Sequence, residues 1–166
     1  MDLVDVPSAL PTLLPLVSPG GLCYFTLNFD GQTLLEPTVD PDLDERIQAL
    51  YHLSMDERIV NGNTSGDSRT GRHLLWQLPG AGAELLAAGA SDWVVHPQRK
   101  SYPADERYFL HFIVDTIYQE LAGHPTLDSE AFADWTRTRH HQIENGTLIY
   151  IAHQLDILAR IRGRAE

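Results

Sequence analysis

The stretch SPGGLCYFTLNFDG, residues Ser18 to Gly31, joins a Gly-Gly turn to a nearly unbroken run of apolar and aromatic residues. Such a run is typical of a strand that is covered on both faces in an α/β sheet. We expect the strand to span Leu22 to Phe29 and to stop at the turn-forming residues Asn28, Asp30 and Gly31. Because buried backbone groups without partners are costly, this strand needs a neighbour on each side.

Composition narrows the class of protein to which this strand belongs. A chain of 166 residues is long enough for one globular domain with a core. Its 12 basic and 23 acidic side chains give a net charge of -11, which argues against a nucleic-acid surface. Cys23 is the only cysteine, so no disulfide can form within the chain. No run approaches the roughly 20 apolar residues of a membrane helix. We therefore expect a cytoplasmic protein without a nucleic-acid or membrane partner.

Apolar residues recur at helical spacing in five segments, and each begins or ends with capping or breaking residues. The segments are 7–17, 43–59, 67–78, 103–121 and 128–146. Glu84 to His96 is expected to contain a second strand. The last segment, Thr147 to Leu158, fits both the helical spacing of apolar residues and the alternation of a strand. Its alternating isoleucines favour a strand. The glycine-rich stretch 61–71 is either a mobile linker or a loop that becomes ordered around a ligand.

Six blocks of the sequence together resemble the C-terminal half of class I S-adenosylmethionine-dependent methyltransferases, over nearly the whole chain. The blocks are DLVDVP, GGLCYFTLNFDG, YHLSMDERI, DSRTGRHLL, AGASDWVVHP and LIYIAHQLDILAR. The resemblance implies one α/β domain over residues 1–166, a partial Rossmann-like sheet, with a helical insertion at about 103–146. It makes Leu22 to Phe29 the fifth of seven strands, and places the sixth within 84–96. The seventh, within 147–158, inserts antiparallel between them.

The cofactor half of that family fold has no counterpart in these residues. The sequence contains no glycine-rich turn between a first strand and a helix, and no acidic residue placed to hold the ribose. The resemblance therefore implies S-adenosylmethionine as the cofactor of the complete fold only, and we expect the chain alone to bind no cofactor and to be inactive. Two hypotheses remain: a truncated methyltransferase for a small polar acceptor, or a non-enzymatic half-domain that binds or completes a partner protein.

Three groups of polar residues are candidates for contact with the acceptor substrate. Asp30 follows the first strand, where ligands of open α/β sheets lie, although an Asx-turn would explain it equally simply. Tyr51, His52, Asp56 and Arg58 surround one helix face, either as a binding cluster or as surface pairs.

Arg69 and Arg72, the third group, stand at a helix start that would suit a carboxylate or phosphate, or are simply solvated. The eight histidines show no metal-binding spacing, and His140-His141 reads as a helix surface, so we expect no metal site. The strand at 22–29 is expected to leave one edge unpaired, which favours self-association or a partner there.

Overall fold

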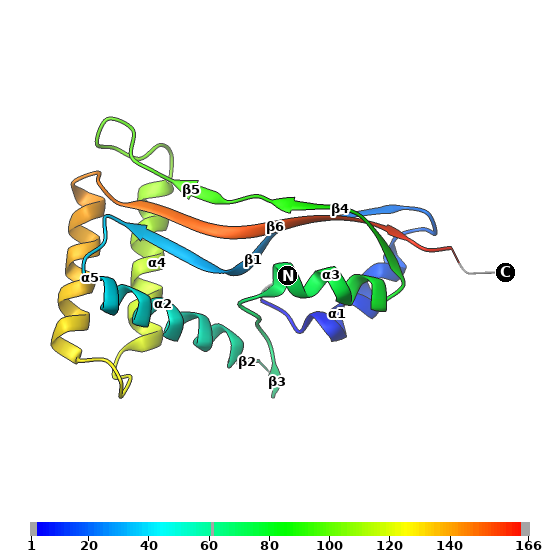
Figure 1. Cartoon of the computed structure of the whole chain (residues 1–166), viewed down its shortest axis with the longest axis horizontal. Helices are drawn as coiled ribbons and strands as arrows, with labels where there is room; N and C mark the ends of the chain where they lie inside the picture. Colours follow the sequence, from blue (N-terminus) through cyan, green and yellow to red (C-terminus); the bar gives the residue numbers. More distant parts are fainter. Residues whose placement is uncertain (1–2, 61, 164–166) are drawn as a thin grey trace. The chain divides into compact units, whose positions relative to one another are not determined.

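An antiparallel sheet flanked by helices makes up the computed structural model, which describes residues 3–60 and 62–163 (Figure 1). The elements in chain order are α1 (Val6–Leu13), η1 (Leu14–Leu16), β1 (Leu22–Glu36), α2 (Pro41–Asp56), β2 (Ile59–Val60), β3 (Asn63–Thr64), α3 (Thr70–Gly80), β4 (Ala83–Ala90), β5 (Trp93–Val95), α4 (Glu106–Leu121), α5 (Ser129–Glu144) and β6 (Ile149–Ile161). The predicted α/β class is confirmed. Among the described residues, no helix combines the length and the apolar character needed to cross a bilayer.

The chain divides into two compact units, and the boundary falls inside β1 and β6. Unit 1 consists of Met1–Gln32, Met55–Trp93 and Ala152–Glu166, and unit 2 consists of Thr33–Ser54 and Val94–Ile151. The two long strands thus contribute residues to both units. The predicted helical segment at about 103–146 contains α4 and α5.

The strand order is β1-β6-β4, with β5 also paired to β6. The last segment is therefore a strand, as its alternation predicts, and it lies between the two earlier strands. β4 and β6 run antiparallel from the pair Ala83 and Ile161 to the pair Ala90 and Leu155, with an irregularity between Leu85 and Ala87. The single strand predicted for residues 84–96 is instead two strands, β4 and β5, separated at Ser91 and Asp92.

β1 corrects the prediction that the strand ends at residues 28 to 31. It continues to Glu36, and Asn28 and Asp30 are buried inside it. These polar side chains tolerate burial because they have partners: Asn28 Nδ2 donates to the carbonyl oxygen of Leu155 at 2.8 Å, and Asp30 binds Arg72. The turn-forming residues therefore lie in an irregular stretch of a longer strand, not at its end.

One face of the sheet in unit 1 packs against α1 and α3. The buried members of this core are Val6, Leu10, Leu14, Leu74, Leu78, Ala83, Ile157 and Ala159. On β1, Cys23 and Phe25 pack against the same core, whereas Leu22 and Tyr24 are more than half exposed. The expectation of a strand covered on both faces is thus wrong for the start of β1, because alternate side chains there face solvent.

Unit 2 is held together around a buried arginine on α5. The Arg139 side chain is fully buried, and its Nη2 forms an ion pair with Asp44 of α2. Trp135 Nε1 donates to the same carboxylate, and Arg139 Nη1 donates to the carbonyl oxygen of Pro37 at 2.8 Å. Burial lowers the pKa of Arg139, although its hydrogen bond with Asp44 opposes that shift.

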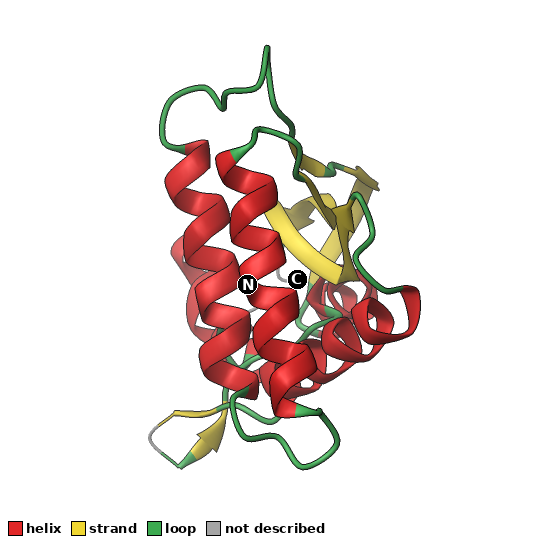
Figure 2. Cartoon of the chain, turned by 90° about the vertical axis from the view of Figure 1, so that its left-hand side faces the viewer, coloured by secondary structure: helices red, strands yellow, loops and turns green. Residues whose placement is uncertain are grey.

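Aspartate side chains cap the start of two helices in this unit. The Asp40 carboxylate accepts the main-chain N–H of Leu43 at 3.0 Å before α2, and Asp128 accepts that of Ala131 at 2.8 Å before α5. α4 and α5 lie side by side (Figures 1 and 2).

Candidate functional site

Four polar side chains from four separate segments of unit 1 meet at the middle of the sheet. Asp30 comes from β1, Arg72 from the first turn of α3, His153 from β6, and Asp92 from the turn between β4 and β5. We call these four residues the polar cluster. The strand order explains the meeting, because β6 lies between β1 and β4 and brings His153 within reach of both carboxylates.

Asp30 and Arg72 form the most extensive contact of the polar cluster. Arg72 Nε donates to Asp30 Oδ1 at 2.8 Å, and Nη2 donates to Oδ2 at 2.9 Å. The side chain of Asp30 is 7% exposed and that of Arg72 is 50% exposed. Burial raises the pKa of Asp30, but the hydrogen bonds and charge of Arg72 outweigh it and hold the pKa below its usual value. Asp30 is therefore a fixed anion with a half-exposed cation beside it.

His153 is oriented by the second carboxylate. Its Nδ1 lies 2.7 Å from Asp92 Oδ1, and its Nε2 lies 3.8 Å from Asp30 Oδ2. In the neutral ring, the short contact with Asp92 assigns the proton to Nδ1 and leaves the lone pair on Nε2. A histidine held in this way, about one-third exposed, can accept a proton from a bound molecule.

The turn that carries Asp92 is held in place by Asp156 of β6. Asp156 Oδ1 accepts from Ser91 Oγ at 2.7 Å and from the main-chain N–H of Leu27 at 2.9 Å. These hydrogen bonds lower the pKa of Asp156. Leu27 has a φ of 56°, in the left-handed region that a leucine rarely adopts. Asp156 thus stabilises both the turn before β5 and the irregular part of β1.

Gly71 allows α3 to approach the sheet closely enough for Arg72 to reach Asp30. A Cβ at Gly71 would lie 2.9 Å from the carbonyl oxygen of Asn28 and 3.1 Å from the Cβ atoms of Asp30 and Leu155. The first distance is shorter than real Cβ contacts allow. The glycine in the DSRTGR block is therefore required by packing at this site.

The second half of the glycine-rich stretch is anchored by carboxylates. Asp56 Oδ1 accepts the main-chain N–H of Ser68 at 2.6 Å, and its Oδ2 accepts Ser68 Oγ at 3.1 Å. Asp67 accepts the main-chain N–H of Arg69 at 2.8 Å and lies 2.6 Å from Nδ1 of His73. Asn61, at the start of the stretch, lies outside the described residues. Residues 67 to 70 are consequently held by hydrogen bonds within the chain.

The structure brings together only some of the residues that the sequence singles out. Asp30 and Arg72 meet, and the Asx-turn explanation of Asp30 is wrong, because its carboxylate binds the start of α3. Arg69 is exposed at the same helix start, where a Cβ on Gly31 would lie 3.5 Å from its Cγ.

Residues of the expected cluster on the helix around residue 52 contact several different segments. Asp56 binds Ser68, and the main chain of Arg58 bonds to Met55 and Ser65. In unit 2, His52 Nε2 lies 3.3 Å from Thr33 Oγ1, and its ring centroid lies 6.3 Å from that of Tyr51. α2 contains Tyr51, His52 and Asp56 but ends before Arg58, and the i, i+4 spacing could not show which segment each side chain would contact.

Asp92 and His153 were not among the predicted site residues. The sequence carries a signal for His153 alone, because a polar residue inside the strand segment IAHQL needs a partner if it is partly buried. Asp92 lies in the turn between β4 and β5, where an exposed carboxylate gives no such signal. The partners are 61 residues apart, so strand alternation alone could not pair them.

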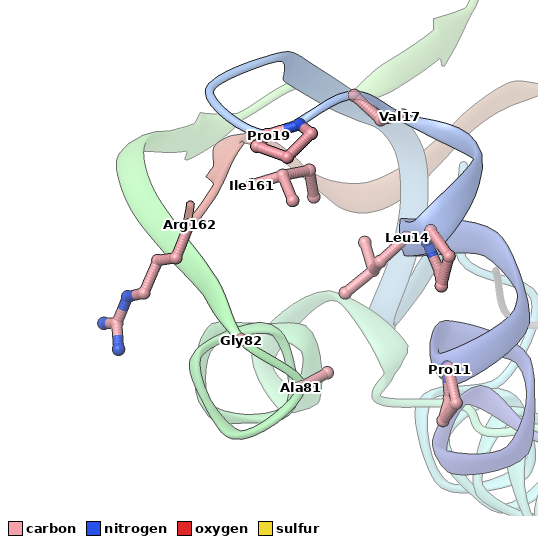
Figure 3. Close-up of a pocket in the computed structure, with 9 residues that line it drawn as sticks. Pro11, Leu14, Val17, Pro19, Ala81, Gly82, Ile161 and Arg162 are labelled. Atoms are coloured by element: carbon pink, nitrogen blue, oxygen red, sulfur yellow. The ribbon is translucent and has the colours of Figure 1, made fainter. Parts of the chain in front are cut away.

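Apart from the polar cluster, unit 1 has an open pocket of about 670 Å³ at the ends of β6 and α3 (Figure 3). Its walls are Pro11, Leu14, Pro15, Val17, Pro19, Ala81, Gly82, Ile161 and Arg162. The Arg162 guanidinium points away from the centre of the pocket (Figure 3). None of the predicted site residues lines this pocket, and its prolines and aliphatic side chains offer no pair of groups for acid-base chemistry.

Comparison with models of known protein families gives no match to this chain. Comparison with curated proteins likewise gives no match.

Proposed function

We propose that this chain forms the acceptor-binding half of a class I S-adenosylmethionine-dependent methyltransferase-like fold that acts on a small polar acceptor. Its strands β1, β4 and β6 would be the fifth, sixth and seventh strands of a partial Rossmann-like sheet. Strands and a glycine-rich turn outside these 166 residues would bind the cofactor, so the chain alone would be inactive.

The order of the strands is the observation that carries the proposal. β6 is the last strand in the sequence, yet it lies between β1 and β4 and is antiparallel to β4. The six sequence blocks that resemble the methyltransferases imply this insertion of the last strand. Placing a C-terminal strand between two earlier ones is a specific feature of a fold, because consecutive strands are usually neighbours.

The polar cluster supports the acceptor side of this chemistry. Methyl transfer from a sulfonium is an in-line displacement, to which a protein contributes positioning and, for many acceptors, removal of a proton. His153 Nε2, with Nδ1 held by Asp92, has the lone pair that this step requires. The half-exposed guanidinium of Arg72 would orient a carboxylate or phosphate of the acceptor, and Asp30 holds it in place.

The test begins with the genomic DNA upstream of the codon for Met1. An in-frame segment that encodes a glycine-rich strand-turn-helix supports the proposal, and a stop codon close upstream favours the alternative below. The longer polypeptide is then assayed for transfer of labelled methyl from S-adenosylmethionine to a panel of small hydroxy, amino and carboxylic acids. His153→Asn is expected to lower kcat by about 100-fold or more. The exposed His96→Asn is the control and should leave kcat unchanged. Transfer that is insensitive to His153→Asn would remove this residue from the mechanism.

A second candidate function is a non-enzymatic half-domain that binds or completes a partner protein. The observation that favours it is the outer edge of β1, which has no strand neighbour among the described residues. Leu22 and Tyr24 on that strand are 58% and 64% exposed. An exposed edge with apolar side chains is a template for a further strand. If a partner protein restores methyl transfer, the chain both binds that partner and forms part of a methyltransferase. If the partner binds without restoring methyl transfer, the chain is a binding module.

A further inference from the structure

Two histidines of unit 2 face each other across the pair of helices α4 and α5. Nδ1 of His111 on α4 lies 2.7 Å from Nδ1 of His140 on α5. Their rings are nearly parallel, with an interplanar angle of 17° and centroids 5.0 Å apart. Both side chains are partly exposed, at 27% and 29%, so solutes can reach them. His140 is thus not the plain surface residue that the sequence suggested.

A carboxylate of the opposite helix holds the far nitrogen of each ring. His111 Nε2 lies 3.0 Å from Glu144 of α5, and His140 Nε2 lies 3.1 Å from Asp115 of α4. The pairing is reciprocal, since each helix supplies one histidine and, four residues later, the carboxylate that binds the histidine of the other. Four residues are about one helical turn, so each helix presents both groups on one face.

These contacts decide what can lie between the two rings. Each carboxylate accepts a hydrogen bond from the Nε2–H of the ring that it contacts, which leaves the lone pair of a neutral ring on Nδ1. Two lone pairs that face each other at 2.7 Å repel unless a proton lies between them. A metal cation can take the place of that proton where the two rings move apart.

The surroundings favour a metal cation in that place. Histidines that bind metals almost always donate their other ring N–H to a carboxylate or carbonyl group, and both histidines here are arranged in that way. Glu144 and Asp115 carry two negative charges against the single positive charge of Arg107, which forms an ion pair with Glu144. The local charge therefore attracts a cation, as does the net charge of -11 on the chain.

We propose that Nδ1 of His111 and Nδ1 of His140 form a binding site for a divalent transition-metal ion such as Zn²⁺, Co²⁺ or Ni²⁺. This site is independent of the proposed methyl-transfer function. It departs from the expectation, based on sequence spacing, that the chain has no metal site, because spacing cannot show a pair of ligands contributed by two helices.

The geometry limits the kind of metal and the strength of the site. Within the described part of the chain, no group of three or more histidine, cysteine or carboxylate side chains is placed to hold a metal. Two imidazoles would be the protein ligands, and water would fill the other positions. Zn–N bonds of about 2.0–2.1 Å place two tetrahedral ligands about 3.3 Å apart, so the rings would open by about 0.6 Å on binding. Imidazole ligands select these ions over Mg²⁺ and Ca²⁺, which prefer oxygen.

Titration of the full 166-residue chain with Zn²⁺ by calorimetry, and with Co²⁺ by visible absorption, tests the site. We expect one saturable equivalent and no binding of Mg²⁺. His140→Asn and His111→Asn should each weaken the affinity more than about tenfold, and Asp115→Asn about tenfold, because it holds the His140 ring. The exposed neighbour His141→Asn is the matched control and should change the affinity less than about twofold, since it touches neither ligand.

A second measurement on the unmodified chain covers the case in which a variant does not fold. In long-range ¹H–¹⁵N spectra, Zn²⁺ should shift the Nδ1 resonances of His111 and His140 together and leave that of His141 in place. The proposal would be overturned if Zn²⁺ were coordinated by other residues or through Nε2 of these histidines. It would also be overturned if the affinity survived both substitutions, or if no saturable binding were seen at millimolar Zn²⁺.

Discussion

Arg72 binds Asp30 through its side chain and its main chain at once. Its Nε and main-chain N–H donate to Asp30 Oδ1 at 2.8 and 2.9 Å, and its Nη2 donates to Oδ2 at 2.9 Å. One carboxylate on β1 therefore serves as a bidentate ion-pair partner and as an acceptor for the first turn of α3. The contact links sheet and helix at the centre of the polar cluster.

Arg72→Ala is expected to destabilise the chain, because it leaves the buried carboxylate of Asp30 with the main-chain donor alone. Since the guanidinium is half exposed and screened by water, the loss should be about 1–2 kcal/mol in the free energy of unfolding, measured with urea. Arg69→Ala, an exposed residue of the same loop, is the control and should cost less than about 0.5 kcal/mol. Equal losses in the two variants would show that the Asp30 contact contributes nothing specific.

The contribution of Asp30 to stability should depend on pH in one direction. Its pKa is lowered in the folded chain, relative to an unfolded value of about 3.9. The stabilisation is therefore fully present above that value and is lost as the pH falls through the lower folded pKa. We expect the difference in unfolding free energy between the wild type and Asp30→Asn to be constant from about pH 5 to 7 and to shrink below about pH 4. A difference that stays constant down to about pH 2 would contradict the lowered pKa.

Gly71→Ala should be the most damaging glycine substitution in α3. The new methyl group would meet the carbonyl oxygen of Asn28 at 2.9 Å and push the helix away from β1. Overpacking of this kind typically costs about 1–3 kcal/mol. Gly80→Ala, in the same helix, adds a methyl group that would meet no atom within 4 Å, so it should change stability by less than about 0.5 kcal/mol. Thermal unfolding of both variants measures the contrast, and a harmless Gly71→Ala would mean that α3 lies farther from the sheet.

The outer edge of β1 is expected to drive association of the isolated chain. Leu22→Lys places a charge on this edge and Tyr24→Pro removes a backbone donor, so either should shift a dimer or larger assembly towards monomer in sedimentation velocity. Ile59→Lys, a similarly exposed apolar residue on β2, is the control. A folded monomer at high concentration, unchanged by Leu22→Lys and by Tyr24→Pro, would show that this edge is not a contact surface.

Local signals predicted the helices and the class of fold well. Apolar spacing and caps such as Asp40 and Asp128 act within a few residues, and both aspartates accept a main-chain N–H at the start of a helix. The length of β1 was missed because it depends on contacts between residues far apart in the sequence. Asn28 and Asp30 favour turns by themselves, but their partners Leu155 and Arg72 lie 127 and 42 residues away, and only those contacts allow the strand to continue.

The candidate site was predictable only in part, because Asp30 and Arg72 were expected to serve it and Asp92 and His153 were not. Asp30 and Arg72 were each expected to serve the site, yet their pairing depends on how closely Gly71 lets α3 approach the sheet. His153 belongs to an alternating strand, where a polar residue reads as one more exposed position. Its role follows only from the strand order that brings Asp92 and Asp30 to either side of it.

Calorimetric titration of S-adenosylhomocysteine tests most directly the proposed division between an acceptor half and a separate cofactor half. It is carried out on the 166-residue chain and on a longer polypeptide that contains the cofactor-binding half required by the proposed function. We expect no saturable binding to the 166-residue chain, which lacks a glycine-rich turn after a first strand, and micromolar binding to the longer polypeptide. Micromolar binding to the 166-residue chain by itself would contradict the proposed function, because the cofactor site would then lie among these residues.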